Sequence, residues 1–119
     1  MFTLYQKSTC VSCKKALAWL QAQGCVDRVR VLDIEKEPPL EAAVRDAIAR
    51  FGAQACLNAR SAVYKAKGLA KGLPDTATLL AWIREDPNLI KRPLLVGARN
   101  EVLAMGYDEA ALVTLFDEG

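Results

Sequence analysis

A strand, a loop, a helix and a second strand follow one another in residues 1–35, and this order constrains the fold more than any other feature of the chain. Residues 2–5 are rich in β-forming side chains, and apolar residues then recur at helical spacing from Ala16 to Leu20. Gly24 stands where a left-handed residue ends many helices, and Val29 opens a second β-prone run. Because a helical crossover joins parallel strands, we expect a βαβ unit with two parallel strands.

The middle of the chain is helical. The apolar residues from Leu40 to Phe51 share one helical face, and Gly52 stands just beyond the end of this predicted helix. Residues 53–74 are less regular, and residues 75–86 predict another helix, capped by Asp75 or Thr76 and ended by Pro87. These segments predict a helical insertion over about residues 38–90.

The C-terminal part predicts a β-hairpin followed by a helix. The apolar runs 94–96 and 101–104 flank a four-residue turn at 97–100, and Asp108 precedes a helical pattern that reaches Phe116. A chain of 119 residues is the size of one domain. The order βαβ, helices and ββα therefore predicts one α/β domain over residues 1–119, with a thioredoxin-like fold, a mixed four-stranded sheet and a helical insertion.

Charge and composition exclude several classes of function. The 16 Lys and Arg residues against 14 Asp and Glu give a net charge of +2, and the basic residues are scattered, so no direct nucleic-acid binding is expected. No window approaches the roughly 18 apolar residues of a membrane span, and no signal peptide is recognisable, which predicts a cytoplasmic protein without membrane contact. The chain has no histidine, which excludes Cys–His catalysis and imidazole metal ligands.

The pair Cys10 and Cys13 stands between the first predicted strand and the first helix. A thiolate at a helix N-terminus faces unpaired backbone N–H groups and the positive end of the helix dipole, which lower its pKa. Cys10 is therefore the candidate nucleophile. Cys13 lies one turn further on the same face, where it can resolve a mixed disulfide on Cys10.

Half of a zinc site is the alternative interpretation of this CxxC motif. The remaining cysteines, Cys25 and Cys56, are 31 positions apart and supply no second CxxC or CxxH pair, so no metal site is predicted. Cys25 is expected at the start of the second strand and Cys56 in an apolar helical turn. Both are interpreted as small buried apolar side chains.

Two arginines lie in settings that favour a site. Arg60 interrupts a stretch of small apolar residues, and Arg92 directly precedes Pro93 and an apolar strand. An arginine at that point places its guanidinium either at the end of the sheet or in a pocket there. The bond before Pro93 is a candidate cis peptide. Arg99, at the predicted hairpin tip, is interpreted as solvated.

Several segments together resemble the arsenate reductase/Spx family along most of the chain: residues 4–5, 8–16 and 19–20, then 58–61, 86–93 and 106–109. The resemblance implies a thioredoxin fold with a helical insertion and a cis bond before Pro93. It also implies that Cys10 is the nucleophile and that Arg60 and Arg92 hold an oxyanion, while glutathione and glutaredoxin complete the reduction. A third arginine of the arsenate reductases falls near Met105, so we expect arsenate reduction to be weak or absent.

The CxxC motif is also similar to that of the Spx branch, whose members are thiol-switched regulators that bind the RNA polymerase α subunit. The residues and the resemblance together predict a thiol–disulfide redox protein with Cys10 as nucleophile and Cys13 as resolving thiol. The expected activity is reductase-like, with no bound cofactor and with glutathione or a thioredoxin or glutaredoxin system as reductant. The alternatives are a redox-switched regulator of the Spx kind, and a structural interaction domain if both thiols are inert.

Overall fold

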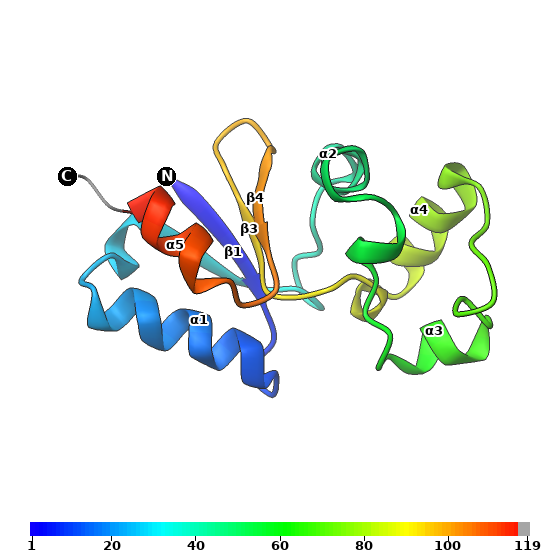
Figure 1. The fold of residues 1–119 in the computed structure, drawn as a ribbon, viewed down its shortest axis with the longest axis horizontal. Coiled ribbons are helices and arrows are strands. Elements are labelled where there is room, and N and C mark those ends of the chain that lie inside the picture. Colours follow the sequence, from blue (N-terminus) through cyan, green and yellow to red (C-terminus); the bar gives the residue numbers. More distant parts are fainter. Residues whose placement is uncertain (117–119) are drawn as a thin grey trace.

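A computed structural model of the chain describes residues 1–116 (Figure 1). The strands are β1 (Phe2–Gln6), β2 (Val29–Asp33), β3 (Leu94–Val96) and β4 (Val102–Met105). The α-helices are α1 (Val11–Ala22), α2 (Glu41–Phe51), α3 (Ala62–Ala66), α4 (Thr76–Glu85) and α5 (Glu109–Phe116). Three short 3₁₀ helices lie between them: η1 (Val26–Arg28), η2 (Gln54–Cys56) and η3 (Pro87–Leu89). Among the described residues, no helix is long and apolar enough to cross a membrane.

The four strands form one mixed sheet in the order β2-β1-β3-β4. β1 pairs in parallel with β2, from Phe2 opposite Val29 onward, and antiparallel with β3, where Leu4 lies opposite Leu95. β3 and β4 form the predicted hairpin, with an irregularity in register after Leu95. The mixed four-stranded α/β sheet and its thioredoxin-like topology, predicted from the sequence, are thereby confirmed.

Each face of the sheet carries its own apolar core, because successive strand residues point to opposite sides. Leu4 packs with Leu20 of α1 and Leu112 of α5 on one face. Tyr5, its neighbour, belongs to the core on the other face, which the residues of α2 and α4 complete. Figure 1 shows the same division, with α1 and α5 on one side of the sheet and α2, α3 and α4 on the other.

The segment between β2 and β3 holds the helices α2, α3 and α4. Asp75 caps α4, since its carboxylate accepts a hydrogen bond from the N–H of Thr78 at 3.1 Å. Leu40 and Phe51, the two ends of the apolar face expected from the sequence, are 59 % and 42 % exposed. Both stand at the ends of α2, Leu40 as the N-cap and Phe51 as the last residue, beyond the turns that the core covers.

The prediction that Cys25 opens the second strand is wrong. Cys25 precedes the 3₁₀ helix η1, and β2 begins only at Val29. The N–H of Cys25 donates to the carbonyl of Leu20, so this cysteine belongs to the turn that leaves α1. The sequence alone could not distinguish the two, because an apolar residue after a glycine, such as Cys25 after Gly24, is compatible with a short 3₁₀ turn and with the start of a strand.

Candidate functional site

Cys10 is the N-cap residue of α1, at the end of the loop that follows β1. Its backbone is extended, with φ −87° and ψ 122°, and its N–H donates to the carbonyl of Lys7 at 3.0 Å. The N–H of Cys13 donates to Cys10 Sγ at 3.3 Å. The sulfur thus satisfies one of the N–H groups that the first turn of a helix leaves unpaired, at the positive end of the helix dipole.

The two thiols have opposite electrostatic surroundings. Burial raises the pKa of Cys10, but hydrogen bonds from Cys13 and the nearby Arg92 guanidinium outweigh it, so this pKa lies below its ordinary value. Cys13 is 1 % exposed. Burial, followed by the hydrogen bond that its thiol gives to Cys10, raises the pKa of Cys13 to about 12. As the pH rises, Cys10 is therefore the first of the two thiols to lose its proton, while Cys13 remains a protonated donor beside it.

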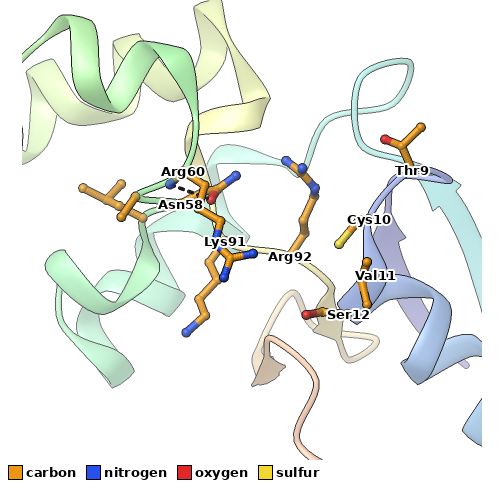
Figure 2. Close-up of a pocket in the computed structure, with 10 residues that line it drawn as sticks. Thr9, Cys10, Val11, Ser12, Asn58, Arg60, Lys91 and Arg92 are labelled. Carbon is orange, nitrogen blue, oxygen red and sulfur yellow. Dashed lines mark hydrogen bonds between the residues drawn. The ribbon is translucent and has the colours of Figure 1, made fainter.

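A cavity of about 520 Å³ opens at Cys10. Figure 2 shows Thr9, Cys10 and Ser12 on one wall, Asn58 and Arg60 on the other, and Arg92 between them. The walls come from three segments that are distant in sequence: the start of α1, the loop before α3 and the segment before β3. The lining contains the cations Arg60, Lys91 and Arg92 and no carboxylate, so the cavity favours an anion.

Arg92 is half-buried and lies directly before the cis bond to Pro93. Its Nη1 donates to Asn88 Oδ1 at 3.2 Å. Its Nε is buried, and within the described residues it has no hydrogen-bond partner. Arg92 faces Cys10 closely enough to lower the pKa of that thiol through both its charge and a hydrogen bond. The sequence allowed the Arg92 guanidinium either at the end of the sheet or in a pocket there, and the structure places Arg92 in the lining of the cavity.

Arg60 is exposed and is presented by a tightly bonded loop. Asn58 Oδ1 accepts a hydrogen bond from the N–H of Arg60 at 3.2 Å, and the carbonyl of Asn58 accepts one from Ser61 Oγ at 2.8 Å. The N–H of Asn58 donates to the carbonyl of Leu89 at 2.7 Å, which fastens this loop to η3. Arg60 and Arg92 are thereby brought to one cavity, together with Cys10.

Lys91 is a cavity residue that the sequence reasoning missed. Its side chain passes over Gly106, where a Cβ atom would stand 3.2 Å from Lys91 Cε and where φ is +75°. Met105, the position of the missing third arginine, packs instead against the apolar core. The signal for Lys91 was its place next to Arg92. No periodicity indicated which way either side chain turns, because neither residue belongs to a strand.

The other two cysteines lie away from the cavity. Cys25 and Cys56 are 9 % and 0 % exposed. The Cys56 thiol donates to the carbonyl of Gly52 at 3.2 Å, and burial raises its pKa to about 11. Across residues 1–116, no three His, Cys, Asp or Glu side chains are grouped so that they could hold a metal ion.

The βαβ and ββα sheet, with a thiol pair where the first strand meets the first helix, defines a thioredoxin-like protein with a CxxC motif. The chain belongs to the ArsC family, whose family model matches residues 5–115. It is 30 % identical over 114 residues to the global transcriptional regulator Spx of Enterococcus faecalis, an alignment that covers 92 % of this chain and 81 % of the relative. Spx of Bacillus subtilis is 28 % identical over 113 residues, with coverage of 92 % and 82 %.

Solved structures show the same fold. A protein from Streptococcus mutans, described as a possible arsenate reductase, superimposes with a TM-score of 0.79 at 29 % identity, over 90 % of this chain and 91 % of the other. A protein from Staphylococcus aureus, whose structure was determined by solution NMR, gives a TM-score of 0.72 at 27 % identity, over 96 % and 97 %. The relatives thus carry both a reductase description and a regulator description.

Proposed function

We propose that the chain is a cytoplasmic thiol–disulfide oxidoreductase in which Cys10 is the nucleophile and Cys13 the resolving thiol. The observation that carries this proposal is the hydrogen-bonded pair at the start of α1. Cys10 Sγ accepts the N–H of Cys13 at 3.3 Å, and the two thiols have pKa values displaced in opposite directions. A low-pKa thiolate beside a protonated partner is the arrangement that thiol–disulfide exchange uses.

The reaction begins when the Cys10 thiolate attacks one sulfur of a substrate disulfide. A mixed disulfide forms on Cys10, and the other substrate sulfur leaves as a thiolate. The Cys13 thiol then gives its proton to that thiolate and attacks Cys10 Sγ, which releases the second substrate sulfur as a thiolate. The substrate disulfide has gained two electrons, and the protein is left with a Cys10–Cys13 disulfide.

The reductant that restores the two thiols is glutathione or a thioredoxin or glutaredoxin protein. The cationic cavity supports an anionic thiol such as glutathione, because Arg60 and Lys91 are available to its carboxylates while its sulfur lies at Cys10. A cavity of about 520 Å³ falls in the size range of small-molecule sites. Every redox equivalent in this cycle is carried by sulfur, so no bound cofactor is required.

The experiment is oxidation of the purified protein by diamide, followed by mass mapping of its cysteine peptides. We expect a Cys10–Cys13 bridge that glutathione with glutaredoxin, or thioredoxin with its reductase, reduces again. Cys25 and Cys56 should remain thiols. A protein that forms no Cys10–Cys13 bridge, or whose bridge none of these systems reduces, would contradict the assignment as an oxidoreductase.

A second candidate is a redox-switched regulator that binds the RNA polymerase α subunit. The similarity to Spx of Enterococcus faecalis, at 30 % identity, favours it. Oxidation would replace the Cys10 thiolate beside Arg92 with a neutral disulfide, which gives the surface two electrostatic states. Pull-down of the α subunit by the reduced and the oxidised protein separates the two functions. Binding of the α subunit that depends on the redox state supports the regulator function. Absence of binding argues against the regulator and favours the oxidoreductase.

A further inference from the structure

The side chain of Asn88 connects Arg92 to a hydrogen-bonded network at the ends of β1 and β2. Its Oδ1 accepts from Arg92 Nη1 at 3.2 Å and from Lys7 Nζ at 3.3 Å. Its Nδ2 donates to Glu35 Oε2 at 3.2 Å and to Asp86 Oδ1 at 3.1 Å. An asparagine amide has one acceptor side and one donor side. Two cations on one side and two carboxylates on the other fix which side faces Arg92.

Lys7 and Glu35 complete the network around this amide. Lys7 Nζ lies 3.2 Å from Glu35 Oε1, so the two charges are paired with each other as well as with Asn88. Hydrogen bonds from Asn88 and from Lys7 hold the pKa of Glu35 below its usual value, which keeps this carboxylate an acceptor. Lys7 is also tied to the site through its backbone, because its carbonyl accepts the N–H of Cys10 at 3.0 Å.

Arg92 needs such a partner because its side chain is long and its charge is useful only in one orientation. Its Nε is buried without a hydrogen-bond partner among residues 1–116, so that atom does not fix the guanidinium. The neutral amide of Asn88 orients Arg92 and leaves its full positive charge available to the Cys10 thiolate. A carboxylate at the same place would pair with Arg92 and compete with that thiolate.

We propose that Asn88 is a positioning residue for the chemistry of Cys10: its amide oxygen holds the Arg92 guanidinium beside the cysteine, and Lys7 and Glu35 hold the amide. This inference rests on the proposed role of Cys10 as nucleophile and deepens it. Asn88 itself is not among the residues that line the cavity at Cys10. It acts through Arg92, which does line it.

The test is the pH dependence of Cys10 alkylation by iodoacetamide in the wild type, Asn88→Ala, Arg92→Ala and the double variant. Among residues 1–116, the titratable or charged side chains that line the cavity beside Cys10 or contact it are Cys13, Arg60, Lys91 and Arg92. We expect Asn88→Ala to raise the pKa of Cys10 and to slow its alkylation at neutral pH by about two- to tenfold, the equivalent of one hydrogen bond. In the Arg92→Ala background the same change should have no further effect.

Two controls separate positioning from a general structural role. Gln23→Ala removes an exposed amide at the other end of α1 and should leave the profile at the wild-type position. Asn88→Asp keeps the shape and the Oδ1 acceptor, yet its carboxylate should slow alkylation at least as much as Asn88→Ala. Thermal denaturation checks that each variant is folded. If Asn88→Ala does not fold, Asn88→Asp serves as the test in its place.

The inference and the proposed function fail in different ways. If wild-type Cys10 has an ordinary pKa, both are overturned. If wild-type Cys10 has a lowered pKa that neither Asn88 variant moves, only the positioning role is overturned. The positioning role is also contradicted if Asn88→Asp restores the wild-type profile, or if Asn88→Ala shifts the profile equally with and without Arg92.

Discussion

Two thiols three residues apart differ because one lies at the surface of a cavity and the other in the core. Cys10 is partly exposed and faces Arg92, whereas Cys13 is 1 % exposed and its thiol donates a hydrogen bond to Cys10. The same helix turn thus lowers one pKa and raises the other. This asymmetry assigns attack to Cys10 and resolution to Cys13, and it makes the two serine variants distinguishable.

We predict that Cys13→Ser traps adducts on Cys10. After reaction with glutathione disulfide, the wild type should be recovered with a Cys10–Cys13 bridge, because the neighbouring thiol displaces glutathione faster than a solution thiol does. The variant should retain glutathione on Cys10, and intact mass distinguishes the two products. Equal retention of glutathione by the wild type and by the variant would contradict the role of Cys13.

Arsenate reduction is expected to be weak or absent. Met105 packs against the apolar core, and the cavity's third cation is Lys91, whose amine is a point charge without the two-pronged geometry of a guanidinium. One charge-assisted contact fewer costs roughly 1.5–3 kcal/mol of oxyanion binding. Turnover with arsenate, glutathione and glutaredoxin provides the measurement. Robust arsenate-dependent oxidation that Cys10→Ser abolishes would show that two arginines suffice.

At the scale of single residues, the sequence indicated Cys10, Cys13, Arg60 and Arg92. It did not indicate the residues beside them, Asn88 and Lys91. The thiols were found because a CxxC motif between a strand and a helix fixes their geometry. Asn88 lies in the three-residue 3₁₀ helix η3, and Lys91 lies between η3 and β3. Both were missed because neither segment is long enough for a period to relate sequence position to side-chain direction. A signal that both residues share is their place in the segment 86–93, one of the segments that carry the family resemblance.

Among the elements, the short helix α3 and the loop before it place Arg60. Ser61 is 8 % exposed and caps α3: its Oγ accepts from the N–H of Tyr64 at 3.2 Å and donates to the carbonyl of Asn58 at 2.8 Å. The N-cap of a helix satisfies a backbone N–H that the first turn leaves unpaired. The position of Arg60 therefore depends on a buried hydroxyl rather than on apolar packing.

We predict that Ser61→Ala lowers the free energy of unfolding by roughly 1–2 kcal/mol, because it removes a helix cap and leaves polar backbone groups unpaired. Urea denaturation in the presence of a reductant measures this change. Ser8→Ala, at an exposed position of the loop after β1, is the matched control and should have little effect. Equal stability of the two variants would show that the cap contributes nothing.

Elements with strong periodicity were predicted well. Residues 75–86 gave α4 with the Asp75 cap, and residues 94–104 gave the β3–β4 hairpin. Residues 53–74 were predicted as less regular, with Cys56 in a helical turn that the structure shows as η2. The rest of this segment was harder to predict, because its conformation is fixed by long-range bonds that no local pattern contains. One of these is the bond from the N–H of Lys91 to the carbonyl of Cys56 at 2.8 Å.

Across the whole molecule, the site lies where the thioredoxin-like part meets the inserted helices. Cys10 is the N-cap of α1, Arg60 lies in the loop before α3, and Arg92 lies between η3 and β3. Figure 1 shows α1 on one side of the sheet and α3 on the other. Both cores contain cysteines that take no part in this site. Cys56 is one of them, and its burial makes it useful as a reporter of global stability.

We predict that the protein loses stability as the pH rises from about 9 toward about 11, in part through Cys56. Burial raises the pKa of this thiol from 9.0 to about 11, so the folded protein keeps a proton that the unfolded chain releases in this range. The unfolded state then binds fewer protons, and the free energy of unfolding falls as the pH rises. Urea denaturation of Cys56→Ala should show a shallower decline. Parallel curves for the variant and the wild type would contradict this origin.

Cys10 is proposed as the reactive thiolate, and the rate of iodoacetamide alkylation of each cysteine as a function of pH tests this assignment. Mass mapping assigns the product to Cys10, Cys13, Cys25 or Cys56. We predict that Cys10 reacts first at neutral pH, with a midpoint below the ordinary value of 9.0, because hydrogen bonds from Cys13 and the charge of Arg92 stabilise its thiolate. Alkylation of Cys10 no faster than that of Cys25 or Cys56 would show that Cys10 is not the reactive thiolate.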